Sequence, residues 1–112
     1  DSNSFKHFRR NKMAFIVEKT FTRPDVTTPW PWDEFPVDKR AELEALRSSN
    51  NVTMENSMSA DGLVATYTDS CASADEYAEY FTDANAIWTA GGLFTSATNN
   101  NVVINHTVLE DT

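Results

Sequence analysis

The chain has 112 residues and a formal net charge of −8, and 40% of its residues are hydrophobic. This length suits one domain with a single core, and the composition argues against an intrinsically disordered chain. The sequence contains no run of about 18 apolar residues, so we expect no membrane-spanning segment.

Charge is distributed unevenly along the chain. Residues 1–12 contain four basic side chains and one acidic side chain, whereas residues 13–112 contain five basic and sixteen acidic ones. An acidic domain repels the phosphates of a nucleic acid, so we expect neither a nucleic-acid partner nor a membrane partner. We predict that residues 1–12 form a basic, mobile leader and that residues 13–112 form a single domain.

Cysteine and histidine are scarce in this sequence. Cys71 is the only cysteine, which rules out a disulfide within the chain. A lone thiol fits a reducing compartment, so we expect a cytoplasmic location. His106 is the only histidine outside the leader, and the spacing typical of a metal site is missing. We therefore expect no metal and no cofactor.

The first predicted element is a strand at Ala14–Arg23. Phe15, Val17 and Phe21 fall on one face of this strand, whereas Ile16 falls on the other. Apolar side chains on both faces are typical of a central strand that is covered on two sides.

The next segment, Pro24–Pro36, is predicted to be a loop. It contains four prolines, which remove backbone donors and fix φ. It also contains Trp30, Trp32 and Phe35. Because a solvated loop rarely needs three large aromatic side chains, we predict that this loop folds back as a lid over apolar surface.

A helix and a hairpin follow the loop. The apolar spacing predicts a helix at Phe35–Ser48, with Pro36 in its first turn. Alternation of apolar and polar residues predicts strands at Val52–Ser59 and Leu63–Asp69, joined by a tight turn at Asp61-Gly62.

The last part of the chain contains a second helix and a fourth strand. The helix is predicted at Ser73–Ala90, where Ser73 and Glu76 have the spacing of a capping box, and Gly91-Gly92 would end it. We predict a polar linker at Leu93–Asn101 and a strand at Val102–Leu109.

The order of these elements predicts the fold class. Strand, helix, strand, strand, helix, strand is the split βαβ order, so we expect an α+β, ferredoxin-like βαββαβ domain. Such a domain has a four-stranded antiparallel sheet with two helices on one face.

The order and lengths of these elements, over roughly residues 13–112, resemble the dimeric α/β-barrel superfamily. This superfamily includes antibiotic-biosynthesis monooxygenase-like domains, stress-responsive barrel proteins and small haem-degrading enzymes. The resemblance implies that two sheets pack face to face across a two-fold axis, so a homodimer is expected. The apolar residues on both faces of the predicted strands support a covered second face: Phe15 and Val17 against Ile16, Leu63 against Val64, and Val102 and Ile104 against Val103 and Leu109.

The resemblance also implies a cleft between the sheet and the helices that binds an apolar or amphipathic molecule, either fatty-acid-like or aromatic. The aromatic side chains and the single domain histidine supply the candidate ligand-binding set, which is Phe15, Phe21, Trp30, Trp32, Tyr67, Tyr77, Phe81, Trp88 and His106. Lys19, Arg23 or His106 could meet an acidic head group. The alternative is that these aromatic side chains form an ordinary packed core.

An enzymatic function remains a second alternative. Cofactor-independent monooxygenases of the superfamily use Asn, Trp, Tyr or His side chains, so the resemblance makes His106, Asn56 and Tyr67 the catalytic candidates for an oxygenase or an isomerase. The haem-degrading relatives use an asparagine, a tryptophan and a histidine on the second helix. This helix has Asn85 and Trp88 but lacks the histidine, which argues against haem chemistry. A structural or interaction module without a ligand is the third alternative.

Overall fold

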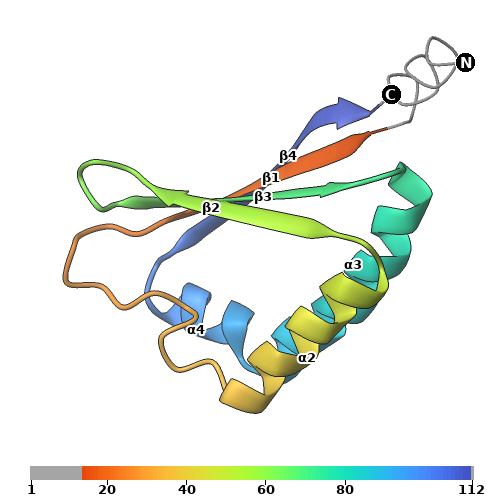
Figure 1. Cartoon of the computed structure of the whole chain (residues 1–112). Helices are drawn as coiled ribbons and strands as arrows, with labels where there is room; N and C mark the ends of the chain where they lie inside the picture. The colour runs from red at the N-terminus through yellow and green to blue at the C-terminus, as the bar shows by residue number, and fades with distance from the viewer. Residues whose placement is uncertain (1–13, 112) are drawn as a thin grey trace, which may run out of the picture.

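The computed structural model describes residues 14–111, and the predicted leader lies outside this range. These residues form a four-stranded antiparallel sheet and three helices (Figure 1). The elements in chain order are β1 (Phe15–Thr22), α2 (Val37–Ser49), β2 (Thr53–Met58), β3 (Val64–Cys71), α3 (Ala74–Ala90), α4 (Leu93–Asn99) and β4 (Val103–Asp111). The strand order β2-β3-β1-β4 places β1 and β3 in the centre. The predicted α+β, ferredoxin-like fold is confirmed.

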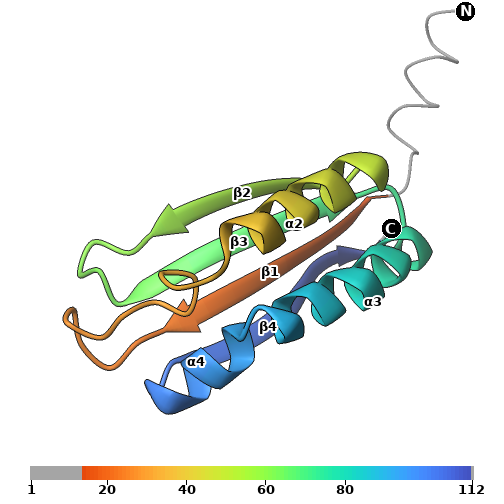
Figure 2. The same ribbon diagram turned by 90° about the horizontal axis from the view of Figure 1, so that it is seen from below.

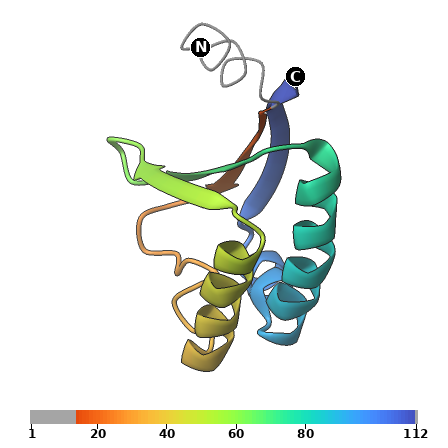
Figure 3. The ribbon, with the colours of Figure 1, turned by 45° about the vertical axis from the view of Figure 1, so that its right-hand side comes forward.

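All three helices lie on one face of the sheet (Figure 2). Helices α2 and α3 run side by side and slope away from the strands, so the layer between helices and sheet widens with distance from the β3–α3 connection (Figure 3). Among residues 14–111, no helix has the length and apolar character needed to cross a membrane.

The central strand β1 determines what lies between the sheet and the helices. Its residues alternate between buried and half-buried, and the buried face carries Phe15, Val17, Lys19 and Phe21. This alternation follows from the two-residue period of a strand. Three of the four inward positions are apolar and the fourth is a lysine, so β1 places an amine within the apolar layer.

The opposite face of the sheet is mostly polar. The register assigns to it Ile16, Glu18, Thr20, Thr22, Thr53, Glu55, Ser57, Val64, Thr66, Thr68, Ser70, Val103, Asn105, Thr107 and Glu110. Three of these side chains are aliphatic, three are glutamates, and none is basic. The prediction of an apolar second face is therefore wrong.

The sequence pattern misled because some of its apolar residues lie at or beyond strand ends. Leu63 and Val102 lie just before β3 and β4 rather than within them. Leu109 lies at the irregularity where the register between β1 and β4 shifts. The homodimer stays a prediction that rests on the resemblance, without the apolar face that supported it.

The predicted polar linker after α3 is also wrong, because residues Leu93–Asn99 form α4. Leu93 and Ala97 are buried one helical turn apart, and this short apolar stripe is sufficient to hold the helix against the domain. Gly92 has the left-handed conformation (φ 83°) that separates α3 from α4.

The N-termini of helices α3 and α2 are capped in different ways. Ser73 caps α3 and its hydroxyl accepts a hydrogen bond from the Glu76 N–H, which is one of the two bonds of the predicted capping box. Helix α2 begins at Val37, with Pro36 in the capping position rather than in the first turn. The proline has no N–H that would need a partner there.

Candidate functional site

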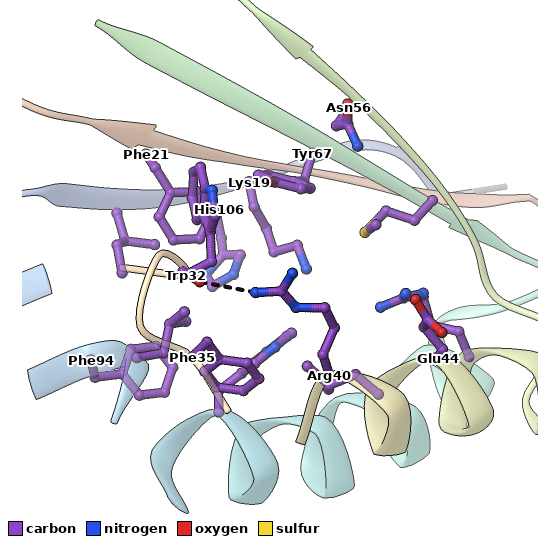
Figure 4. Close-up of a pocket in the computed structure, with 16 residues that line it drawn as sticks. Lys19, Phe21, Trp32, Phe35, Arg40, Glu44, Asn56, Tyr67, Phe94 and His106 are labelled. Atoms are coloured by element: carbon purple, nitrogen blue, oxygen red, sulfur yellow. Dashed lines mark hydrogen bonds between the residues drawn. The ribbon is translucent and has the colours of Figure 1, made fainter. Parts of the chain in front are cut away.

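A cavity of about 270 Å³ lies between the inward face of the sheet and the helices. Its walls come from β1, β2, β3, β4, α2, α3, α4 and the Pro24–Pro36 loop (Figure 4). The lining residues are Lys19, Phe21, Trp32, Phe35, Arg40, Leu43, Glu44, Arg47, Met54, Asn56, Tyr67, Trp88, Leu93, Phe94, Ile104 and His106. Most of this lining is apolar or aromatic, which is typical of small-molecule sites.

The Pro24–Pro36 loop covers one end of the cavity, as the sequence predicts. Trp30 stacks on Trp32 with ring centroids 4.9 Å apart and an interplanar angle of 8°. Trp32 in turn meets Phe21 and Tyr67 edge to face at 5.2 and 5.4 Å. These contacts extend the aromatic layer of the sheet into the loop, so Trp32 forms a wall of the cavity and Trp30 supports it from behind.

Arg23 fixes the other side of this loop. Its Nε donates to the Gly62 carbonyl at 2.9 Å and its Nη1 donates to the Thr28 carbonyl at 2.8 Å. Its guanidinium also lies 4.3 Å from the centroid of a Trp30 ring. Arg23 therefore ties the loop to the β2–β3 turn and does not line the cavity, so the prediction that it could meet an acidic head group there is not supported.

A buried ion pair lies at the base of the cavity, where Lys19 is a lining residue and Asp69 lies behind it. Lys19 Nζ lies 3.0 Å from Asp69 Oδ2, and the side chains are 7% and 0% exposed. The Tyr77 hydroxyl donates to the same carboxylate oxygen at 3.1 Å. Burial lowers the pKa of Lys19, although the charge of Asp69 opposes this shift. Burial and the Asp69 charge both raise the pKa of Tyr77, so its hydroxyl remains a donor.

The rim of the cavity is polar and positively charged. Arg40 is exposed and Arg47 is half-buried, and both project from α2. Arg40 Nη2 donates to the Trp32 carbonyl at 3.0 Å and so links α2 to the loop (Figure 4). A guanidinium has five donors, so others stay free to bind a ligand. Glu44 is the one acidic residue among those that line the cavity.

The three predicted catalytic candidates, His106, Asn56 and Tyr67, all line this cavity. Tyr67 and His106 flank Lys19 directly on the neighbouring strands. Although His106 as a whole is an exposed residue, partial burial of its ring, and then the Lys19 charge, lower its pKa, so the ring is neutral at neutral pH. Asn56 lies at the exposed edge formed by β2.

The predicted ligand-binding set divides into three groups. Phe21, Trp32, Tyr67, Trp88 and His106 line the cavity. Phe81 and Trp30 lie in a second layer, where Phe81 packs on Trp88 and His106 with centroids 5.7 and 5.6 Å apart. Phe15 and Tyr77 pack on each other, 5.3 Å between centroids, and are not among the lining residues.

Sequence reasoning missed both arginines of the rim and all of α4. Arg40 and Arg47 are seven residues apart on α2, a spacing that places them on one helical face. That spacing was the available signal, although charged residues on one helical face more often face solvent. Leu93 and Phe94 lie in a segment whose composition predicts a polar linker.

Comparison with known proteins supports the fold and no family. No family model matches the chain, and no curated protein matches it. A de novo designed protein with a ferredoxin fold has 17% sequence identity and a TM-score of 0.51, and the match covers 89% of this chain and 88% of the design. A hydantoinase/carbamoylase family amidase from Burkholderia ambifaria has 12% identity and a TM-score of 0.47; the match covers 89% of this chain and 28% of the amidase chain. The likeness to the designed protein places the described residues in the ferredoxin-like fold and assigns no activity.

Proposed function

We propose that the domain binds a small amphipathic molecule with a compact apolar body and an acidic group, in the cavity between sheet and helices. One observation carries this proposal. Residues 14–111 contain five basic and sixteen acidic side chains, yet three of the five basic ones, Lys19, Arg40 and Arg47, line the same cavity. Because Asp69 already pairs with Lys19, Arg40 and Arg47 are the two lining cations that are suited to an anionic ligand.

The arrangement of the lining suggests how such a molecule would lie. Phe35, Phe94 and Trp32 gather at one end of the cavity, Glu44 lies toward the other, and Arg40 reaches across between them (Figure 4). The apolar body would therefore lie against the aromatic end, with its acidic group toward Arg40 and Arg47. Arginine suits this role because its planar fork binds a carboxylate through two hydrogen bonds.

The size of the cavity favours a compact ligand. A volume of about 270 Å³ lies just below the range for ligand pockets, which runs from about 300 to 1,000 Å³. Of the two predicted classes, an aromatic acid therefore fits better than a long-chain fatty acid.

Isothermal titration calorimetry with 4-methylbenzoate, decanoate and the uncharged 4-methylbenzyl alcohol tests the proposal. We expect 4-methylbenzoate to bind more tightly than either of the others. Arg40→Gln and Arg47→Gln should each weaken its binding about five- to tenfold, because each removes a charge-assisted contact. Lys39→Gln, which removes a cation of α2 that does not line the cavity, should leave the affinity unchanged. Equal affinity for the acid and the alcohol would contradict the assigned role of the cations.

We propose an alternative chemistry for the same cavity: a cofactor-independent oxygenase or isomerase of the kind suggested by the dimeric α/β-barrel resemblance. Its support is the position of His106, Tyr67 and Asn56 along one cavity, with a neutral imidazole that can accept a proton. Oxygen uptake with a polyphenol should fall on His106→Ala and persist on Asn105→Ala, which changes the opposite face of the same strand. An unchanged rate in His106→Ala would remove His106 from the mechanism.

A further inference from the structure

Lys19 stands apart from the other cations of the cavity because its amine lies inside the apolar layer. It occupies the central strand, between Tyr67 and His106 on the flanking strands. Its side chain is 7% exposed and extends from the sheet into the cavity (Figure 4). Its Nζ lies 4.5 Å from the centroid of a Trp88 ring. A lysine is rarely buried to this degree without a specific role or partner.

The partner of Lys19 retains unused hydrogen-bonding capacity. Lys19 and the Tyr77 hydroxyl both meet Oδ2 of Asp69, whereas Oδ1 is buried and has no hydrogen-bond partner among residues 14–111. The Asp69 carboxylate can therefore accept a proton from the neighbouring Lys19 ammonium group. It can afterwards pair with any cation formed at Lys19 Nζ.

We propose that Lys19 Nζ forms an imine with the aldehyde or ketone carbonyl of a compact apolar ligand, so that the ligand class of the cavity includes aromatic oxo acids. This inference rests on the binding of an apolar acid in the cavity, as proposed above. The Lys19 ammonium group gives one proton to Asp69, and the neutral amine adds to the carbonyl carbon to form a carbinolamine. Loss of water then forms the C=N bond. Return of the proton from Asp69 gives an iminium ion that pairs with the carboxylate.

The surroundings of Lys19 favour this reaction over a purely structural ion pair. A lysine amine becomes nucleophilic when it is desolvated in an apolar pocket or lies near another cation. Both conditions hold for Lys19, because burial lowers its pKa and the nearby Arg47 charge lowers it further, against the opposing effect of Asp69. The groups that face it are Asp69, Trp88, Tyr67, His106 and Arg47.

Reductive trapping tests the proposal on the full chain. The protein is incubated with 4-formylbenzoate and sodium cyanoborohydride, which reduces an imine to a stable secondary amine, and the modified lysines are mapped by mass spectrometry of peptides. We expect Lys19 to be labelled at least about tenfold faster than Lys39, because the cavity holds the aldehyde next to Lys19. Lys39 is a matched internal control, since it is a more exposed lysine outside the cavity.

A competition experiment avoids reliance on a variant of the buried pair. Excess 4-methylbenzoate, which lacks the carbonyl, should slow the labelling of Lys19 and leave that of Lys39 unchanged.

The possible outcomes separate this inference from the proposed function. If calorimetry shows that 4-methylbenzoate binds but Lys19 is labelled no faster than Lys39, the imine proposal fails and the binding proposal stands. If 4-methylbenzoate does not bind and Lys19 shows no preference, both fail. Labelling of Lys19 that 4-methylbenzoate does not slow would also overturn the inference, because the reaction would then not occur in the cavity.

Discussion

Lys19 and Asp69 form a buried ion pair, 3.0 Å between Nζ and Oδ2, that links the two central strands of the sheet, and Lys19 also lines the cavity. The pair connects the stability of the domain to the chemistry of the cavity. Its strength depends on both charges being present, because either charge alone would be buried without compensation.

Asp69→Asn should therefore destabilise the domain. We expect the free energy of unfolding to fall by about 3–5 kcal/mol, because the substitution leaves the Lys19 charge unpaired in an apolar layer. Urea denaturation followed by circular dichroism measures this loss. Glu42→Gln is the matched control, since it breaks the more exposed Lys39–Glu42 pair (3.3 Å) and should cost less than about 1 kcal/mol. Equal effects of the two substitutions would show that burial does not strengthen the Lys19–Asp69 pair.

Trp32→Ala should both destabilise the domain and weaken ligand binding. The substitution removes the side chain that meets Phe21 and Tyr67 and stacks on Trp30, so we expect a loss of about 2–4 kcal/mol in urea denaturation. The affinity for 4-methylbenzoate should fall as well. Val26→Ala changes a residue of the same loop that is 61% exposed, and it should alter neither quantity. Unchanged affinity in a folded Trp32→Ala protein would mean that the loop is not part of the binding site.

Gly91→Ala should disturb the cavity, although Gly91 does not line it. A Cβ at this position would overlap the Phe35 ring, and Phe35 lines the cavity. The backbone of Gly91 is in the ordinary helical region, so the whole effect would be steric. We expect a destabilisation of about 1–3 kcal/mol, measured by urea denaturation. Thr89→Ala, at a neighbouring exposed position, is the control, and an equal effect would argue against the clash.

The stability of the domain should decrease as the pH falls below the ordinary histidine pKa of 6.5, through His106. The folded state lowers the pKa of His106, so on acidification the unfolded chain binds a proton before the folded domain does. This contribution is complete above pH 6.5 and is lost as the pH drops toward the lower, folded-state value. His106→Gln should remove this component when the free energy of unfolding is measured over a series of pH values. If the free energy of unfolding depends on pH in the same way in the unsubstituted protein and in His106→Gln, the lowered pKa of His106 is contradicted.

The element order was predictable because each element carries its own local signal. Apolar side chains on both faces marked β1, the Asp61-Gly62 turn marked the β2–β3 hairpin, and Ser73 marked the start of α3. These signals depend on neighbours in the chain, so they can be read without knowledge of the tertiary structure. Helix α4 could not be read in this way, because two buried residues in a seven-residue polar segment give too weak a period.

The candidate site was only partly predictable, for a related reason. Composition singled out Phe21, Tyr67, His106 and Trp32 as candidates, and the strand register of the structure places the first three on the inward face of the sheet. Which of the inward residues line a cavity and which fill the core depends on how far α2 stands from the sheet, and the sequence does not encode that distance in any local pattern. The pairing register also determines which residues form the outer face of the sheet. That face is mostly polar, although apolar residues in the predicted strands had suggested an apolar one.

The location of a bound acid is the most direct test of the central claim. Methyl-resolved NMR spectra recorded during a titration with 4-methylbenzoate report contact at individual side chains. We predict shifts at the methyl groups of Leu43, Leu93 and Ile104, which line the cavity, and none at those of Val26 and Val37, which are exposed elsewhere. Saturating addition that moves none of the three cavity methyl groups, or that moves only those of exposed residues, would contradict the proposed binding site.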